Sequence, residues 1–161
     1  MEVDILTWNI RGFRRREKRR ALKIMLHKFN PSIVFIQEMK VEKISEIEIK
    51  RLWHKSNLEF AFSPARGSAG GLLSIWNSEL IQVTNKIINH NYIAIIGICK
   101  KSGDSCGVVN VYGPSQDSEK GIFLADLLAV IKSKDIPWCI GGDFNLILDS
   151  EEKRGFRLIV P

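Results

Sequence analysis

Residues 3–37, VDILTWNIRGFRRREKRRALKIMLHKFNPSIVFIQ, decide the fold class of this chain. Residues 3–9 are rich in β-formers and predict a strand, which Gly12 interrupts. Residues 14–29 predict a helix, because apolar side chains recur there at spacings of three and four, namely Leu22, Met25, Leu26 and Phe29. Asn30-Pro31 ends this helix, since the residue before a proline avoids the α region.

Residues 32–37 form a short, largely apolar run, which is typical of a strand buried on both faces. A strand, a helix and a second strand with short connections predict a βαβ-like unit, and therefore an α/β protein. The rest of the chain predicts a polar helix at 44–52 and short strands at 59–63, 72–76, 81–88, 92–99 and 108–112. Turn-rich joints at 64–68, 89–91 and 101–105 indicate antiparallel pairing among these strands.

A second amphipathic helix is predicted at 118–133, and a last buried strand at 136–140 is expected to stop at Gly141-Gly142. The apolar set of that helix is Ile122, Leu124, Ala125, Leu127, Leu128 and Ile131. The sequence therefore predicts an α/β architecture with one mixed sheet or a pair of sheets. With 161 residues, we expect a single domain over 1–161.

Composition excludes several classes of protein. The chain is 45% hydrophobic and 26% charged, which is ordinary globular usage. No run approaches the ~18 apolar residues of a membrane helix, and no signal peptide precedes the first strand, so we expect an intracellular protein. Cys99, Cys106 and Cys139 are too scattered for a disulfide framework. We expect reduced, largely buried thiols, although Cys99 and Cys106 flank a hairpin turn where they can face each other.

The basic charge is concentrated in one segment. Residues 11–28 contain nine of the 24 basic residues and one acid, Glu17, whereas the net charge of the whole chain is only +6. Such a cluster favours a polyanionic partner, with nucleic acid ahead of anionic lipid; the alternative is a solvated helix face. The nucleic-acid contacts expected on this helix are Arg14, Arg15, Arg16, Arg19 and Arg20.

Polar side chains occur at the ends of several apolar strands, where functional groups of α/β sheets converge. They are Asn9, Gln37-Glu38, Tyr112, Asp143 and Asn145. Each has a structural alternative: Asn9 as a cap, Asp143 in an Asx-turn, Glu38 at the surface and Tyr112 on an edge strand. Together, amide, carboxylate and phenol groups suit a hard divalent cation and a phosphate, because Mg²⁺ prefers carboxylate oxygen.

Five segments, which occur along this chain in the order of the family's motifs, resemble the endonuclease/exonuclease/phosphatase family. Their amino-acid sequences are most similar to those of the endonuclease domain of plant LINE-type (non-LTR) retrotransposons. They are Leu6–Gly12, Ile36–Glu38, Gly70-Gly71 through Trp76, Val111–Pro114 and Gly141–Asn145. The retroelement likeness is carried by Pro137–Asn145 with Glu151–Gly155. The resemblance implies a four-layered α/β sandwich, two mixed sheets flanked by helices, which cleaves phosphodiester bonds of DNA with Mg²⁺ (Mn²⁺ as a substitute).

The resemblance also implies roles for the strand-end residues. Glu38 would hold the metal, with Asn9 beside it on the metal or the phosphate. Asp143 would orient and deprotonate the attacking water, Asn145 would position Asp143 and the phosphate, and Tyr112 would hydrogen-bond the phosphate. The resemblance implies DNA as partner and a nuclear location. The composition leads us to expect no membrane partner, and no obligate protein partner is inferred.

One departure from the family concerns its C-terminal Ser-Asp-His segment, which does not occur in these 161 residues. We therefore expect the last strands to be missing, an incomplete domain and little turnover by this chain. His27, His54 and His90 are expected at the surface, outside any catalytic role. Two alternatives remain: a non-catalytic nucleic-acid-binding remnant that uses the basic helix 14–28, and a phosphatase of the same fold.

Overall fold

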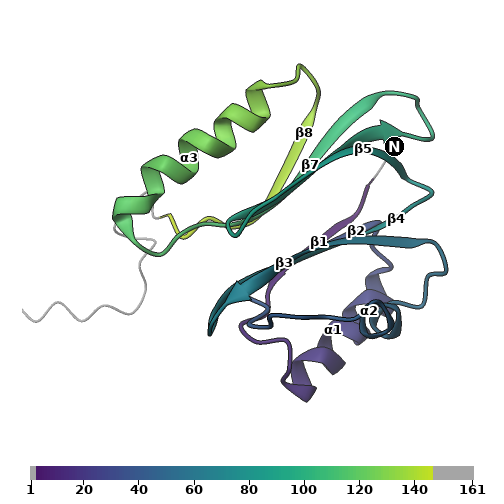
Figure 1. Cartoon of the computed structure of the whole chain (residues 1–161). Coiled ribbons are helices and arrows are strands. Elements are labelled where there is room, and N and C mark those ends of the chain that lie inside the picture. The colour runs from purple at the N-terminus through teal and green to yellow at the C-terminus, as the bar shows by residue number, and fades with distance from the viewer. Residues whose placement is uncertain (1–2, 147–161) are drawn as a thin grey trace, which may run out of the picture.

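The protein is a sandwich of two β-sheets with helices on both outer faces (Figure 1). The computed structural model describes residues 3–146, and all structural statements below concern those residues. The elements in chain order are β1 (Ile5–Asn9), α1 (Arg16–Phe29), β2 (Ile33–Gln37), α2 (Glu46–Leu52), β3 (Leu58–Arg66), β4 (Ala69–Asn77), β5 (Ile81–Ile88), β6 (Tyr92–Cys99), β7 (Ser105–Tyr112), α3 (Asp117–Lys132) and β8 (Trp138–Asp143).

Each sheet combines one parallel pair with antiparallel neighbours. The first sheet has the order β1-β2-β4-β3, and only β1 and β2 are parallel. The second has the order β5-β6-β7-β8, and only β7 and β8 are parallel. The expected βαβ unit and antiparallel strands are therefore confirmed. Because the parallel strands share a direction, Asn9 lies opposite Gln37 and Tyr112 opposite Asp143, at the carboxyl ends of their strands.

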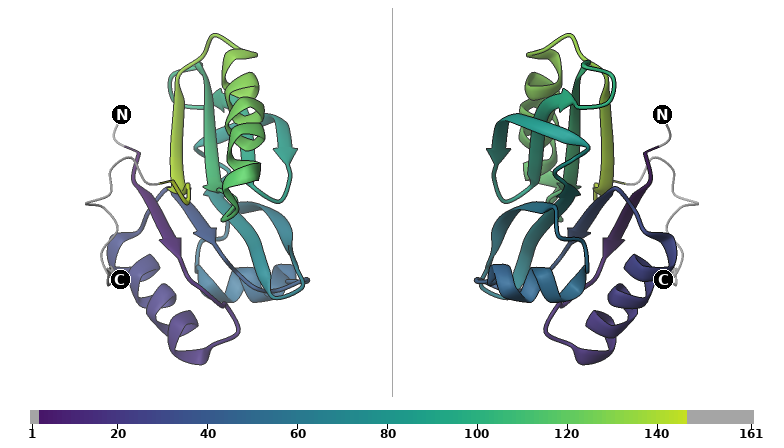
Figure 2. Two further views of the ribbon diagram at one scale, coloured as in Figure 1. Left: turned by 90° about the vertical axis from the view of Figure 1, so that its left-hand side faces the viewer. Right: turned by 90° about the vertical axis from the view of Figure 1, so that its right-hand side faces the viewer.

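Strand periodicity explains the four layers. Successive side chains of β2 point to opposite faces, and all five are buried. Val34 and Ile36 pack under α1 and α2, whereas Ile33 and Phe35 pack against the second sheet. On the far side of that sheet, Val109 and Val111 pack against α3. Figure 2 shows the resulting stack, with α1 and α2 on one outer face and α3 on the other.

Short-range sequence signals determine where α1 ends and where α2, the other helix that covers the first sheet, begins. α1 buries Leu22 and Leu26 and ends at Asn30, whose left-handed backbone directs its N–H to the Leu26 carbonyl before Pro31. α2 begins with a reciprocal capping box between Ser45 and Glu48. None of the helices within residues 3–146 has the length and apolarity that crossing a membrane requires.

The apolar face expected for the second amphipathic helix is wrong in part. α3 buries Phe123 and Leu127, whereas Ile122, Leu124 and Leu128 are exposed, Ile122 by 77%. Apolar residues occur on several sides of α3, so spacing within the helix does not select a face. The shape of the second sheet selects Phe123 instead.

Several strand boundaries also differ from expectation: β4 begins at Ala69 instead of 72, and β7 begins at Ser105 instead of 108. β8 does not stop at Gly141-Gly142 but continues to Asp143. Glycine makes this possible, because Gly142 has a φ of +136° and lies so close to β7 that a Cβ there would be 2.0 Å from the Val111 carbonyl oxygen. β3 continues through Pro64, which an edge strand tolerates because no ladder bond is required there.

The three thiols are free, as expected. Their expected burial is correct for Cys99 but wrong for Cys139, which is exposed on the edge strand β8, and Cys106 is half-buried.

Candidate active site

A cluster of polar side chains lies where the carboxyl ends of β1, β2, β7 and β8 meet at one rim of the sandwich. Asn9 ends β1, Glu38 follows β2, Tyr112 ends β7, and Asp143 ends β8 with Asn145 just beyond it. The cluster spans both sheets, because the Asn9 side-chain Nδ2 donates a hydrogen bond of 2.5 Å to Oδ2 of Asp143. Two residues 134 positions apart in sequence are thus in direct contact.

Both carboxylate oxygens of Asp143 are held in place. Oδ2 accepts from Asn9, and Oδ1 accepts at 3.0 Å from the backbone N–H of Asn145. The second bond is the Asx-turn that the sequence offers as a structural alternative, so the turn and the contact with Asn9 occur together. A carboxylate oriented through both oxygens keeps its remaining lone pairs in a fixed direction, as a proton acceptor for water requires.

Asn145 connects Asp143 to the loop after β7. Its side-chain Nδ2 donates at 2.7 Å to the carbonyl oxygen of Gly113, which directly follows Tyr112. The backbone of Asn145 has a φ of +50°, so these contacts stabilise a conformation that is costly for a residue with a side chain.

Glu38 is flanked by two cations. Its carboxylate lies 3.1 Å from the Lys40 ammonium and 3.8 Å from the Arg11 guanidinium, and its side chain is only 16% exposed. Arg11, Glu38 and Lys40 all have positive φ, at 49°, 53° and 54°. Strained backbone of this kind persists only where the surrounding contacts maintain it, and here it gathers at the rim of the sandwich.

The Tyr112 phenol is sensitive to the same charges. Burial raises its pKa, and the carboxylates of Glu38 and Asp143 raise it further, while the hydrogen bond with Asn145 and the charge of Arg11 act in the opposite direction. The phenol therefore keeps its proton at neutral pH and remains a hydrogen-bond donor.

Beneath the rim lies a buried polar network, of which the sequence interpretation singled out only Gln37. Gln37 Nε2 donates to Thr7 Oγ1 at 3.0 Å and to Asn110 Oδ1 at 2.7 Å. Asn110 Nδ2 in turn donates to the Leu73 carbonyl and to Ser74 Oγ, so the network ties β7 to the first sheet. The signal was present: Asn110 interrupts an otherwise apolar strand, and buried amides are retained only when they are hydrogen-bonded.

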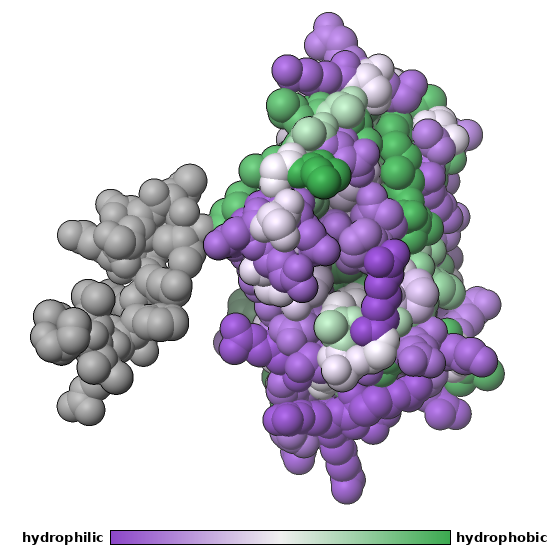
Figure 3. All heavy atoms as spheres, turned by 60° about the vertical axis from the view of Figure 1, so that its left-hand side comes forward, coloured by the Kyte–Doolittle hydropathy of each residue, from purple (hydrophilic) through white to green (hydrophobic). Residues whose placement is uncertain are grey.

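A shallow cavity of about 660 Å³ opens directly over part of this cluster. Asn9, Arg11, Gln37, Asp143 and Asn145 are among its lining residues. In Figure 3, which turns this end of the molecule forward, the lower half of the surface is mostly hydrophilic, while green apolar surface is concentrated in the upper half. The cavity is lined by polar side chains together with Phe144 and Leu146, so it presents both polar atoms and apolar surface.

The donor set can accommodate a hard divalent cation. Asn9 Oδ1 is buried and has no hydrogen-bond partner among the described residues, although its Nδ2 is bonded to Asp143. Glu38 provides a carboxylate just after the neighbouring strand, and Mg²⁺ is held in proteins by one or two carboxylates plus water and substrate oxygens. Residues 3–146 contain no group of three or more His, Cys, Asp or Glu that could enclose a metal, so a transition-metal cage is not formed by that part of the chain.

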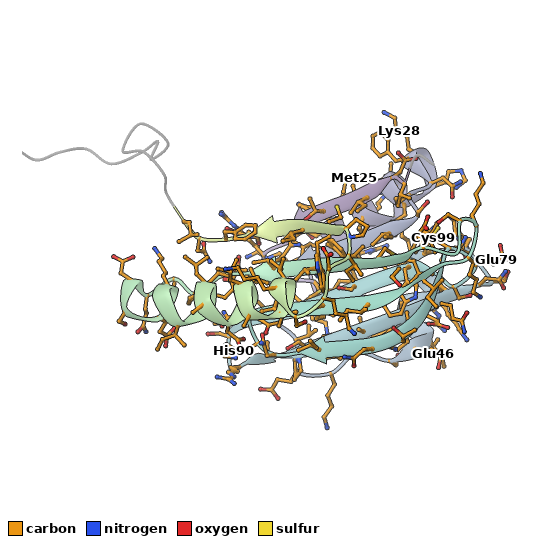
Figure 4. The ribbon with its side chains drawn as sticks, turned by 90° about the horizontal axis from the view of Figure 1, so that it is seen from above. Met25, Lys28, Glu46, Glu79, His90 and Cys99 are labelled. Carbon is orange, nitrogen blue, oxygen red and sulfur yellow. The ribbon has the colours of Figure 1, made fainter. Side chains whose placement is uncertain are left out.

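The histidines lie outside this cluster. His27 and His54 are exposed near α1 and α2, as expected. His90 is also exposed, but it lines a separate pocket of about 150 Å³ that Tyr112 and Ser115 share. Figure 4 shows His90 toward the end of the molecule to which β8 points, with Cys99 at the opposite end. Burial and the charge of Arg66 lower the pKa of His90, whereas Glu119 acts to raise it.

The arginines expected to contact nucleic acid lie on a different surface. Arg14 and Arg15 precede α1, and Arg16, Arg19 and Arg20 lie within it, on the outer side of the first sheet. Arg14 pairs with Glu48 of α2 and also donates to the Lys43 carbonyl. None of the five lines the cavity over Asn9 and Asp143.

A family model of the endonuclease/exonuclease/phosphatase family matches residues 6–159, and the chain belongs to this family. No curated protein sequence matches the chain.

Solved structures share the fold at low sequence identity. The human Nocturnin catalytic domain with bound sulfate is 17% identical with a TM-score of 0.67, and the match covers 89% of this chain and 65% of that one. Truncated TDP2 of Caenorhabditis elegans is 20% identical (TM-score 0.65, 96% and 66% covered). The mannosyl-6-phosphatase of Bacteroides thetaiotaomicron is 12% identical (TM-score 0.64, 89% and 66% covered). The chain thus spans less than two thirds of the length of each of these proteins.

Proposed function

We propose that this protein is a divalent-metal-dependent phosphodiester hydrolase that nicks DNA. The observation that carries the proposal is the hydrogen bond between Asn9 and Asp143, which joins the two sheets where Glu38 and Tyr112 also lie. A carboxylate for a metal, a second oriented carboxylate and neutral donors on one rim are the parts that phosphoryl transfer requires.

In this proposal, Glu38 and Asn9 Oδ1 would hold Mg²⁺, or Mn²⁺ in its place. Bound there, the cation would neutralise charge on the phosphate oxygens. Asp143, oriented by Asn9 and by the Asn145 backbone, accepts the proton of the attacking water. Tyr112 donates a hydrogen bond from its phenol to a non-bridging phosphate oxygen and keeps its proton, and Asn145 holds Asp143 against the loop that follows Tyr112.

The phosphatase alternative rests on one observation besides the fold: a structural neighbour bears the name mannosyl-6-phosphatase. Bis-p-nitrophenyl phosphate and p-nitrophenyl phosphate separate a diesterase from a monoesterase directly. We expect turnover of the diester to exceed that of the monoester; the reverse order would favour the phosphatase.

The decisive test is nicking of supercoiled plasmid by the purified 161-residue chain in Mg²⁺, in Mn²⁺ and in EDTA. These 161 residues contain no Ser-Asp-His, so we expect slow nicking that requires high enzyme concentration. Asp143→Asn and Glu38→Gln should each lower the rate by about 10²-fold or more, because each removes a charge on which the reaction depends. Asp104→Asn, in an exposed turn, is the matched control and should leave the rate unchanged.

Nicking that survives both site substitutions would contradict the proposal. Absence of nicking by a folded chain that still binds DNA would favour the alternative of a nucleic-acid-binding remnant. The amino-acid sequence of the motif Pro137–Asn145 supports a further proposal, namely that the protein originates from a LINE-type retroelement and acts in the nucleus.

A further inference from the structure

A cationic groove runs between α1 and α2, on the outer face of the first sheet and separate from the Asn9–Asp143 cluster. Its main part has a volume of about 370 Å³, with Phe13 and Leu52 among its walls. Five basic residues line it, four from α1 and one from α2: Arg16, Arg19, Arg20, Lys23 and Arg51. A smaller hollow of about 120 Å³ continues it past Lys23, with His27 and His54 on its sides.

The positive charge of this α1–α2 groove is not compensated locally. In the described part of the chain, the only carboxylate that lines it is Glu48, and Arg14 pairs with that carboxylate from outside the groove. The hydrogen bond from the Ser45 backbone lowers the pKa of Glu48 most, burial opposes this, and the contact with Arg14 lowers the pKa further, so Glu48 stays ionised and engaged. Within residues 3–146, no ion pair joins any of the five lining cations to an acid. Five formal positive charges therefore share one concave surface.

The spacing of these cations matches a phosphate chain. Arg16, Arg19, Arg20 and Lys23 recur at three- and four-residue intervals, so they lie along one side of α1. At 1.5 Å per residue, this stripe is about 10 Å long. One strand of B-DNA winds about its axis with a phosphate every ~3.4 Å of axial rise, so successive phosphates are farther apart than that along the strand, and the stripe spans only a few of them.

We propose that the α1–α2 groove binds the phosphate backbone of a nucleic acid, independently of base sequence and of metal. Arginine predominates in the groove, and its planar fork of donors fits phosphate oxygens better than an ammonium does. Phe13 is 1% exposed, so the aromatic ring of the groove is not free to stack on bases. The groove is concave, whereas adsorption to a lipid surface favours a convex or flat basic face with apolar anchors.

This inference changes the set of contacts expected from sequence. Arg14 is engaged with Glu48, and Arg15 does not line the groove, whereas Lys23 and Arg51 do. It also extends the proposed function without depending on it, because binding to the groove needs neither Glu38 nor Asp143.

The test measures binding of a fluorescein-labelled 20-base-pair duplex by anisotropy, in EDTA, between 50 and 300 mM KCl. The groove variant is Arg20→Gln with Arg51→Gln. The matched control is Arg15→Gln with Lys28→Gln, which removes the same charge from residues that do not line the groove; Figure 4 shows Lys28 projecting away from the body. Circular dichroism checks that both variants fold.

We expect the groove variant to lower affinity about tenfold at 100 mM KCl and to reduce the slope of log K against log[KCl] by about 1.8, as loss of two phosphate contacts requires. The control should change the slope by less than half as much. Arg20→Lys with Arg51→Lys should retain the slope but bind more weakly, because the charge remains and the fork is lost.

Equal weakening by the groove variant and its control would overturn the inference, since diffuse charge would then explain binding. So would loss of binding to phosphatidylserine vesicles with no change in binding to DNA, because the groove would then serve a lipid surface. Asp143→Asn separates this inference from the proposed function: it should abolish nicking and leave anisotropy unchanged.

Discussion

Replacing Asn110 by valine tests whether the buried network holds the two sheets, and with them the strand-end cluster, in register. Asn110 is fully buried, and its side chain makes hydrogen bonds to Gln37, Ser74 and the Leu73 carbonyl at 2.7, 3.2 and 3.1 Å. Valine fills most of the same space but leaves the Ser74 hydroxyl and one Gln37 N–H without this partner.

The expected cost follows from those two groups. A buried polar group without a partner costs about 1–3 kcal/mol, so Asn110→Val should lower the free energy of unfolding by about 4 kcal/mol. That is a large part of the ~5–15 kcal/mol of a typical domain. Because Gln37 pairs with Asn9 across β1 and β2, nicking should also fall.

The assay is urea unfolding followed by tryptophan fluorescence, with Asn85→Val on the exposed part of β5 as the matched control. The control should change stability by less than about 0.5 kcal/mol. The double variant Gln37→Leu with Asn110→Val removes donor and acceptor together and should cost less than the sum of the single changes. A loss below about 1 kcal/mol for Asn110→Val, or strict additivity, would refute the network.

Three further predictions address other parts of the fold. Gly142→Ala should lower the free energy of unfolding by about 3 kcal/mol or more and disturb Asp143, because the new Cβ would meet the Val111 carbonyl oxygen. Gly121→Ala in α3 meets no neighbouring atom and should leave the free energy of unfolding unchanged or raise it. Urea unfolding of the two variants distinguishes these effects. Phe123→Ala should lower the free energy of unfolding by about 3–5 kcal/mol, whereas Ile122→Ser should lower it by less than about 0.5 kcal/mol, because only Phe123 is buried. Equal effects of the two substitutions in thermal unfolding would mean that α3 is rotated from the position described. Burial and the hydrogen bond to Asp126 raise the pKa of Tyr92 to about 12, so the stability that this raised pKa contributes is complete below pH 10 and is lost as pH rises through 12. Tyr92→Phe should flatten that alkaline loss, and an unchanged profile in urea unfolding between pH 9 and 12 would contradict it.

Much of the fold could be predicted because its signals are local. The helical spacing of Leu22 and Leu26, the Asn30-Pro31 stop and the apolar run of β2 each depend on a few neighbouring residues. The polar strand ends were also recognisable, since Asn9, Glu38 and Asp143 each follow or end a strand. Prediction failed where the local signal was ambiguous. The buried face of α3 was predicted wrongly because the helix is apolar on several sides, and the end of β8 was predicted too early because Gly141-Gly142 allows the strand to approach β7 closely.

The order of strands and helices, the family motifs and the concentration of positive charge on α1 can be read from the sequence alone. Which of those groups meet depends on how the chain packs in three dimensions. The Asn9–Asp143 bond joins residues 134 positions apart, Glu38 takes Lys40 and Arg11 as partners, and Arg51 of α2 completes a groove begun by α1. Periodicity reports only neighbours along one element, whereas these contacts depend on how two sheets and two helices pack, which is set by side chains from the whole chain.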